Sequence, residues 1–160
     1  MSVSIRRARR DEAPLILTLI RELAAYERLL DEVEASQETL GAALFGPEPR
    51  IFCDIAEWAG EPVGFAIWYY TFSTFQGRHG IYLEDLFVRP EQRGRGLGKA
   101  LLEQLAQRCR DEGLGRLDWS VLDWNEPSIG FYRSLGAEPV AGWARYRLAG
   151  EALRNLASGS

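Results

Sequence analysis

Apolar and polar positions alternate with different periods in the first 50 residues, and the pattern predicts one strand and two helices. Residues 3–7 alternate as a short strand. A helix is expected over residues 11–30, with Asp11 as its N-cap and its apolar side chains on one face. A shorter helix is expected over residues 36–44, and the run of glycine and proline at residues 46–49 ends it.

The period changes to two in the middle of the chain, which indicates a meander of antiparallel strands. Residues 51–57 and 63–70 read as a hairpin with a short turn. A polar loop over residues 72–80 leads to a third strand at 81–88. Pro90 ends that strand, because proline has no N–H to donate to a sheet.

The last third of the chain returns to mixed helices and strands. An amphipathic helix begins at Leu97 and ends at Gly113. A strand at residues 117–121 and a short helix between Asn125 and Gly136 follow, and residues 142–148 are expected to form an edge strand. The sequence thus predicts one α/β or α+β domain over residues 1–157, with a flexible tail at 158–160.

Composition narrows the classes of function. The chain has 160 residues, of which 46% are hydrophobic, and this suits one domain with a substantial core. No apolar run approaches the roughly 20 residues that span a bilayer, so we expect a soluble, cytoplasmic protein that does not bind membranes. The single histidine, His79, and the isolated Cys53 and Cys109 argue against a metal site or a disulfide framework. A net charge of -4 argues against nucleic-acid binding and favours a cationic substrate.

A glycine-rich turn at residues 93–99 is the strongest chemical signal. It lies between a predicted strand and a predicted helix, where unpaired N–H groups and the helix dipole can hold a pyrophosphate. A dinucleotide fingerprint would need glycine or alanine in place of Lys99, and a Walker loop would need serine or threonine in place of Ala100. The pattern that fits is Arg93-x-x-Gly96-x-Gly98. The alternative is a turn that binds nothing.

Four segments together carry a family resemblance: residues 22–27, 82–88, 93–99 and 122–136. With them the chain resembles the GCN5-related N-acetyltransferase (GNAT) superfamily and, within it, the diamine (spermidine/spermine-type) and thialysine acetyltransferases. The resemblance implies a GNAT-type mixed, mainly antiparallel, twisted sheet of about six to seven strands with about four helices. It also implies direct attack on acetyl-CoA, within a ternary complex, by a primary amine of a small diamine, polyamine or thialysine-like amino acid.

The resemblance assigns roles to individual residues. Two would be catalytic, namely Glu84 as the general base and Tyr132 facing the thioester sulfur. Those implied to bind the co-substrate acetyl-CoA are Leu86, Phe87, Val88, Arg93, Gly94, Arg95, Gly96, Leu97, Gly98, Lys99, Asn125, Glu126, Pro127 and Ser128. The residues implied to line the amine site are Tyr26, Glu27, Glu84, Asp85 and Trp143.

The chemistry explains why these residue types are needed. A primary amine with a pKa of about 10.4 is neutral in only about 1 molecule in 2,500 at pH 7, a cost of about 4.6 kcal/mol before attack. Glu84 is the best placed base, since no histidine lies near either motif; alternatively it only anchors a cation. Tyr132 can hydrogen-bond the departing sulfur, or it can be a packing residue beside Phe131.

The acceptor is less well defined than the donor. The loop at 70–80 and the residues just before Trp143 lack the acidic side chains of the polyamine enzymes, which favours a diamine or a thialysine-like amino acid over a long polycation. The branch also implies a homodimer in which Trp143 borders the partner's amine site. Two other readings remain: an acyl-CoA-binding regulatory module without turnover, and an acetyltransferase for a protein N-terminus or an aminoglycoside.

Overall fold

The computed structural model describes residues 2–159, and their contacts divide the chain into two compact units, Met1–Leu122 and Asp123–Ser160. The first unit holds all five strands and three α-helices. Its elements are β1 (Val3–Arg7), α1 (Ala13–Tyr26), α2 (Gln37–Phe45), β2 (Phe52–Trp58), β3 (Glu61–Ser73), β4 (Arg78–Val88), α3 (Leu97–Glu112) and β5 (Leu117–Trp119), with 3-10 turns at Arg10–Glu12, Leu30–Glu32 and Pro90–Gln92. The second unit holds α4 (Glu126–Ser134) and α5 (Gly150–Ala157).

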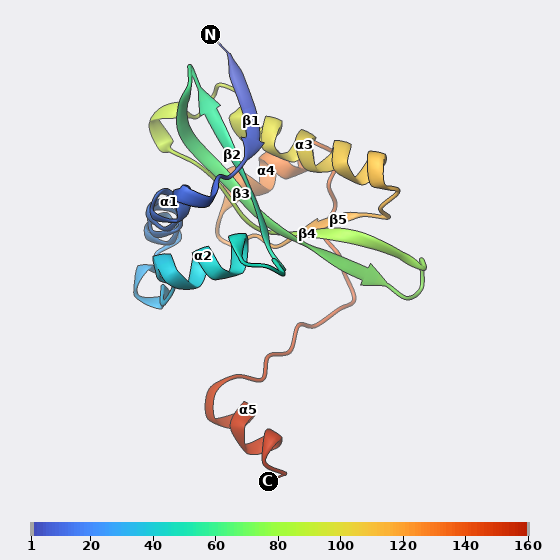
Figure 1. Ribbon diagram of the computed structural model, residues 1–160. Helices are drawn as coiled ribbons and strands as arrows, with labels where there is room; N and C mark the ends of the chain where they lie inside the picture. Colours follow the sequence, from blue (N-terminus) through green and yellow to red (C-terminus); the bar gives the residue numbers. More distant parts are fainter. Residues whose placement is uncertain (1, 160) are drawn as a thin grey trace. The chain divides into compact units, whose positions relative to one another are not determined.

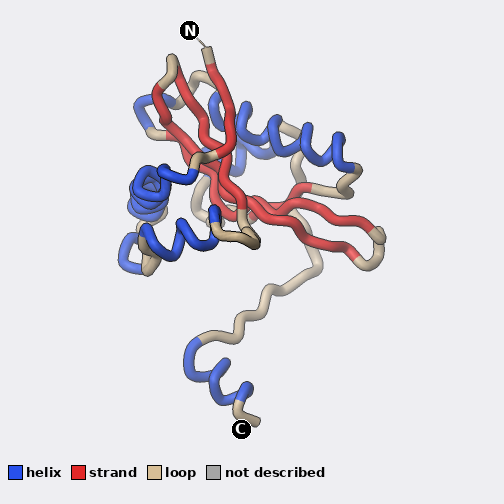
Figure 2. The backbone as a smooth tube through the Cα atoms, in the orientation of Figure 1, coloured by secondary structure: helices blue, strands red, loops and turns tan. Residues whose placement is uncertain are grey.

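The strands form one sheet in the order β1-β2-β3-β4-β5, antiparallel throughout except for the parallel pair β4 and β5. Figures 1 and 2 show β3 and β4 as the long central hairpin of this sheet. The hairpin pairs as far as Ser73 and Arg78, so the loop predicted for residues 72–80 is shortened to a tight turn. Sequence polarity misplaced this boundary, because exposed strand residues are polar as well.

Helices cover both faces of the sheet in the first unit. Cys53 and Ile55 of β2 pack with α1 and α2 in the main apolar cluster. The residue between them, Asp54, points to the opposite face and pairs with Arg108 of α3, Nη1 to Oδ2 3.4 Å. Helix α3 buries Leu97, Leu101, Leu102 and Leu105. Full burial of one such side chain contributes about 1.5–3 kcal/mol to the free energy of folding, so α3 is held firmly against the sheet.

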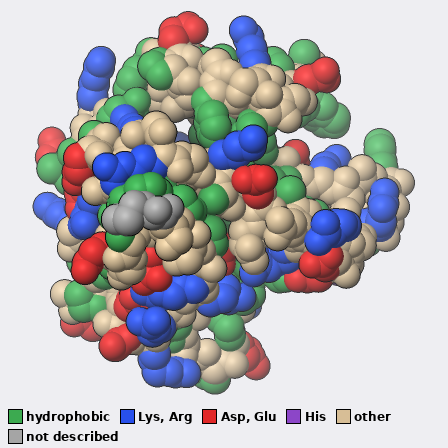
Figure 3. Space-filling view, turned by 90° about the horizontal axis from the view of Figure 1, so that it is seen from above, with side chains coloured by type: hydrophobic (Ala, Val, Ile, Leu, Met, Phe, Trp, Pro, Cys, Tyr) green, Lys and Arg blue, Asp and Glu red, His purple; other side chains and the backbone are tan. Residues whose placement is uncertain are grey.

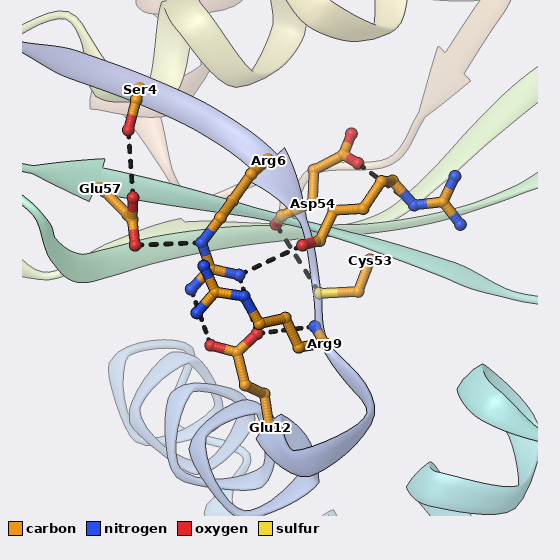
Figure 4. A network of polar contacts seen from close by, with 8 residues as sticks. Ser4, Arg6, Arg9, Glu12, Cys53, Asp54 and Glu57 are labelled. Carbon is orange, nitrogen blue, oxygen red and sulfur yellow. Dashed lines mark hydrogen bonds and ion pairs between the residues drawn. The ribbon is translucent and has the colours of Figure 1, made fainter.

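An ionic network fixes β1 to its neighbours (Figure 4). Arg6 donates to Glu12 at 2.8 and 2.7 Å and to Glu57 of β2 at 3.0 Å. Glu12 also accepts from the backbone N–H of Arg9 at 2.7 Å, just before α1 begins. The hydrogen bond from Arg6 lowers the pKa of Glu12 below its ordinary value. On the face drawn in Figure 3, positive and negative side chains likewise lie beside one another.

Helix α1 ends at Tyr26, earlier than the predicted residue 30. The N–H of Arg28 bonds to the carbonyl of Ala25, and that of Leu29 to the carbonyl of Ala24. With Arg28 at φ 63°, this is a Schellman ending that has arginine at the usual glycine position. Because no glycine marks the site, the sequence pattern did not reveal it.

The prediction for the C-terminal segment is wrong. Residues 142–148 pair with no strand among residues 2–159, and a strand exists only through such pairing. The described residues hold five strands, not six to seven, and five α-helices, not four, because α5 was not foreseen. A flexible tail was predicted at residues 158–160. The N–H of Ser158 donates to the carbonyl of Arg154 in α5, and residue 160 lies outside the described residues.

Replacing Glu12 with Gln should lower the free energy of unfolding by about 1–2 kcal/mol at pH 7, because two charge-assisted hydrogen bonds to Arg6 are weakened. The pKa of Glu12 is lowered in the folded chain, so its contribution is present above the ordinary pKa of 4.5 and is lost as pH falls through the lower, folded value. Urea unfolding at pH 7 and pH 3 would measure this. Glu48→Gln, at an exposed loop position, is the control and should leave the free energy of unfolding unchanged at both pH values.

Candidate active site

A β-bulge at Glu84 sets the geometry of the candidate site. Asp85 faces Ile67 and Leu83 faces Trp68, so Glu84 is the extra residue with no partner on β3. Its side chain is exposed, whereas that of Asp85 is partly buried. The bulge therefore changes the alternation of the strand and presents two successive carboxylates.

Two carboxylates of the first unit, Glu84 and Glu27, lie within electrostatic reach of Asp85. Burial, followed by the negative charges of Glu84 and Glu27, raises the pKa of Asp85 to about 7. Burial also raises the pKa of Glu27, which caps the end of α1. Acidic groups that share a partly buried site and are crowded in this way favour a bound cation, which would relieve their repulsion. The structure thus brings Glu27, Glu84 and Asp85 together, as the sequence predicted for the amine site.

Tyr26 lies at the last position of α1, next to Glu27. Its ring is covered by the guanidinium group of Arg93, whose carbon lies 4.7 Å from the ring centroid. Sequence reasoning placed Tyr26 and Arg93 at opposite ends of the site, one at the amine and the other at the pyrophosphate. The structure joins them directly.

The edge of β4 beyond the bulge is open. Strand β5 pairs with β4 only at Ile81, Tyr82 and Leu83, and no strand of the described chain pairs with residues 84–88 on that side. Backbone N–H and C=O groups on such an edge can hydrogen-bond the amides of an extended ligand. Leu86, Phe87 and Val88, predicted to hold the pantetheine arm, lie on this stretch.

The turn at residues 93–99 has the backbone of an anion site. Gly94 and Gly96 both have φ 80°, and Gly96 is the N-cap of α3. The first helical hydrogen bond runs from Ala100 N–H to the Gly96 carbonyl, 2.9 Å. The preceding N–H groups therefore have no acceptor within the helix and lie at the positive end of its dipole, which fits a pyrophosphate.

The two arginines of the turn contact protein groups. Arg93 Nε donates to the Val88 carbonyl at 3.2 Å. Arg95 donates to Gln92 at 2.6 Å, and its guanidinium carbon lies 4.6 Å from the ring centroid of Trp58. Both arginine side chains are therefore engaged with protein groups, whereas the first N–H groups of α3 have no acceptor within the helix. Sequence reasoning missed Trp58, which lies on the distant β2–β3 hairpin.

The second unit carries the other predicted residues. Asn125 is buried and caps α4, with its side-chain oxygen accepting from Ser128 N–H at 3.3 Å. Glu126 and Pro127 are exposed in the first turn of α4, and Tyr132 is partly buried later in the helix, with its ring 5.6 Å from that of Phe131. Trp143 is 83% exposed in the segment before α5.

Residues 2–159 offer little sign of a metal site, a membrane span or a cysteine nucleophile. No group of three or more metal-ligating side chains was found there, and none of the helices in that range is both long and apolar enough to cross a membrane. Burial raises the pKa of both thiols, Cys53 and Cys109, which makes them poor nucleophiles. His79 packs its ring against Phe72, 4.9 Å between centroids, at the tip of the β3–β4 hairpin.

Comparison with known proteins decides the family. The model of the Acetyltransferase (GNAT) family matches residues 15–137, most of the chain and parts of both units. The chain belongs to this acetyltransferase family. Acetyl-CoA is the co-substrate of GNAT enzymes, which agrees with the open β4 edge and the glycine turn.

Individual relatives refine the comparison. A thialysine N-epsilon-acetyltransferase of Bos taurus is 43% identical over 97% of both chains. A spermidine/spermine N(1)-acetyltransferase-like protein of Homo sapiens is 35% identical over 96% of this chain and 23% of its own length. Among solved structures, an integron cassette protein of V. cholerae superposes with a TM-score of 0.81 at 28% identity, covering 98% of both chains. The resemblance to the diamine and thialysine branch is confirmed.

Replacing Gly96 with Ala should weaken coenzyme A binding about tenfold or more, because a β-carbon at φ 80° is strained and shifts the N–H groups of the turn. Gly113→Ala is a matched control at the other end of α3, with φ 70° and equally open surroundings. Both variants should lose about 1 kcal/mol of stability. Calorimetry with coenzyme A should separate them, and equal affinities would rule out the turn as the anion site.

Proposed function

We propose that this enzyme transfers the acetyl group of acetyl-CoA to the side-chain primary amine of a thialysine-like amino acid or a small diamine. The observation that carries this proposal is the pair of successive carboxylates at the β4 bulge, Glu84 exposed and Asp85 partly buried, with Glu27 near enough to act on Asp85. Acids crowded in this way suit a cationic amine. The identity with thialysine N-epsilon-acetyltransferase over 97% of the chain supports the same substrate class.

Asp85 is proposed as the anchor of the cation and Glu84 as the base. A substrate ammonium beside Asp85 would favour its ionised form and so lower its raised pKa. Glu84 is exposed at the bulge and can reach a water molecule. It would take one proton of the ammonium through that water before the nitrogen attacks. Tyr26 and Glu27 would line the rest of the amine site.

Atoms and charges balance in one direct displacement. The bound ammonium first loses one proton, which Glu84 takes through the water and passes to solvent. The neutral nitrogen then forms a bond to the acetyl carbon, the carbon–sulfur bond breaks, and the second proton leaves the acylated nitrogen to solvent. The sulfur departs as a thiolate, which Tyr132 would stabilise by donating a hydrogen bond. Full proton donation from a phenol of pKa about 10 to a thiolate whose acid has a pKa near 8.5 is uphill by about 2 kcal/mol, so hydrogen bonding is the proposed role.

The donor is proposed to bind along three elements. Backbone groups of residues 86–88 would hold the pantetheine arm, residues 93–99 the pyrophosphate, and residues 125–128 a further part of coenzyme A. Asn125 would act there through the α4 N-terminus that its side chain caps. Because the family match runs from residue 15 to 137, we propose that both units belong to one acetyltransferase domain.

The proposal also covers the oligomeric state of the enzyme and its cellular compartment. A homodimer in which Trp143 borders the partner's amine site would give a partner to the exposed residues Trp143 and Tyr146. The free thiols of Cys53 and Cys109 suit the reducing cytoplasm. A binding module without turnover, or an enzyme for a protein N-terminus or an aminoglycoside, is not favoured, since relatives of nearly full length are thialysine enzymes.

An amine panel tests the substrate class. Thiol release from acetyl-CoA is measured with S-aminoethylcysteine (thialysine), 1,3-diaminopropane, spermidine, an N-terminal peptide and an aminoglycoside. The highest kcat/KM is expected for thialysine or the diamine, because the β3–β4 tip carries no Asp or Glu to hold a longer polycation. A clear preference for spermidine would contradict the assignment, and coenzyme binding without release for any amine would favour the module.

Asp85→Asn tests the cation anchor through pH. With a pKa of about 7, Asp85 is mostly neutral at pH 6 and mostly charged at pH 8, so kcat/KM of the parent should rise about tenfold over that window. The variant should lose this rise and have a higher KM for the amine at pH 8. Asp111→Asn, exposed near the end of α3, is the control and should keep the parental profile. An unchanged profile in Asp85→Asn would remove Asp85 from the amine site.

A further inference from the structure

Two arginines connect the end of β4 to one face of α1. Arg89 donates to both carboxylate oxygens of Glu22, with Nε to Oε1 at 3.1 Å and Nη2 to Oε2 at 3.0 Å. Four residues later, Arg93 covers the ring of Tyr26, which lies four residues after Glu22. Residues four apart lie on the same face of a helix, so the two contacts follow one another along α1. The second contact is at the helix end that carries the proposed amine site.

Arg93 uses different parts of its guanidinium group for different partners. Its Nε donates to the carbonyl of Val88 at 3.2 Å. Its central carbon lies over the Tyr26 ring, 4.7 Å from the centroid, and 5.9 Å from the centroid of the Phe87 ring. A planar guanidinium can stack and donate at once, whereas a lysine ammonium cannot reproduce this arrangement.

Within residues 2–159 Arg93 forms no ion pair with Glu27, Glu84 or Asp85, and its contacts are with the Val88 carbonyl and two aromatic rings. The charges that shift the pKa of Asp85 are those of Glu84 and Glu27, and burial is what shifts Glu27. The contact of Arg93 with the proposed amine site is therefore made through the Tyr26 ring. Its effect on the amine should be steric and orientational.

We propose that Arg93 is a positioning residue for the acceptor amine: it fixes the Tyr26 ring beside Glu27 from the turn that binds the donor. This inference rests on the proposed function, because it requires Tyr26 to line the amine site. It gives the first residue of the glycine turn a role on the acceptor side. Arg89, through Glu22, keeps α1 docked when Arg93 is changed.

The test is Arg93→Lys, which keeps the charge and loses the planar stack. KM for thialysine, measured at saturating acetyl-CoA, should rise about five- to tenfold while kcat changes less than twofold, and this rise should exceed any accompanying rise in the Kd for acetyl-CoA. Arg21→Lys, on the exposed side of α1, is the matched control and should leave both constants unchanged. Equal unfolding midpoints in urea would show that Arg93→Lys remains folded.

A double-mutant cycle with Tyr26→Leu separates positioning from general damage. If Arg93 acts through the ring, Arg93→Lys should have no further effect on the amine KM once Tyr26 is Leu. Additive effects, or a rise in the acetyl-CoA Kd in place of the amine KM, would overturn the proposal. The parent enzyme is measured first: lack of turnover with every amine contradicts the proposed function, whereas parental turnover with additive variants contradicts only the role of Arg93.

Discussion

The central constraint in the first unit is that β4 must satisfy its backbone hydrogen bonds along an edge that β5 covers for only three residues. Just before the bulge, residues 81–83 are paired with a strand on both sides, and Ile81 and Leu83 are buried in the core. After the bulge the strand is paired on one side, and it leads directly into the glycine turn and α3. Glu84 and Asp85, the open edge and the turn therefore follow one another along one strand-to-helix connection.

Sequence patterns predicted the parts of the fold whose causes are local. A helix was expected to begin at residue 36, and Ser36 caps α2 by accepting from Thr39 N–H through its side chain. Gly113 was expected to end α3 and has φ 70° there. The end of α1 was missed because Arg28 occupies the left-handed position without a glycine to mark it. The strand expected at 142–148 failed because strand formation depends on a neighbour, which no local pattern encodes.

The candidate site was predictable in its residue types and less so in its contacts. Spacing identified the anion turn, and the left-handed φ values of Gly94 and Gly96 agree with it. The sequence did not reveal which of two adjacent acids is buried, because the bulge that decides between Glu84 and Asp85 depends on the register with β3. Nor could it pair Arg93 with Tyr26, which are 67 residues apart and meet only through the packing of α1.

The open stretch of β4 has a consequence for solubility as well as for binding. An unpaired strand edge is a template on which a strand of another molecule can align, and proteins discourage such pairing with bulges and with charges near the edge. This strand has both, since the bulge twists it at Glu84 and two carboxylates repel a second copy. The irregularity that places two acids side by side on β4 is thus also one of the features by which proteins discourage edge-to-edge pairing.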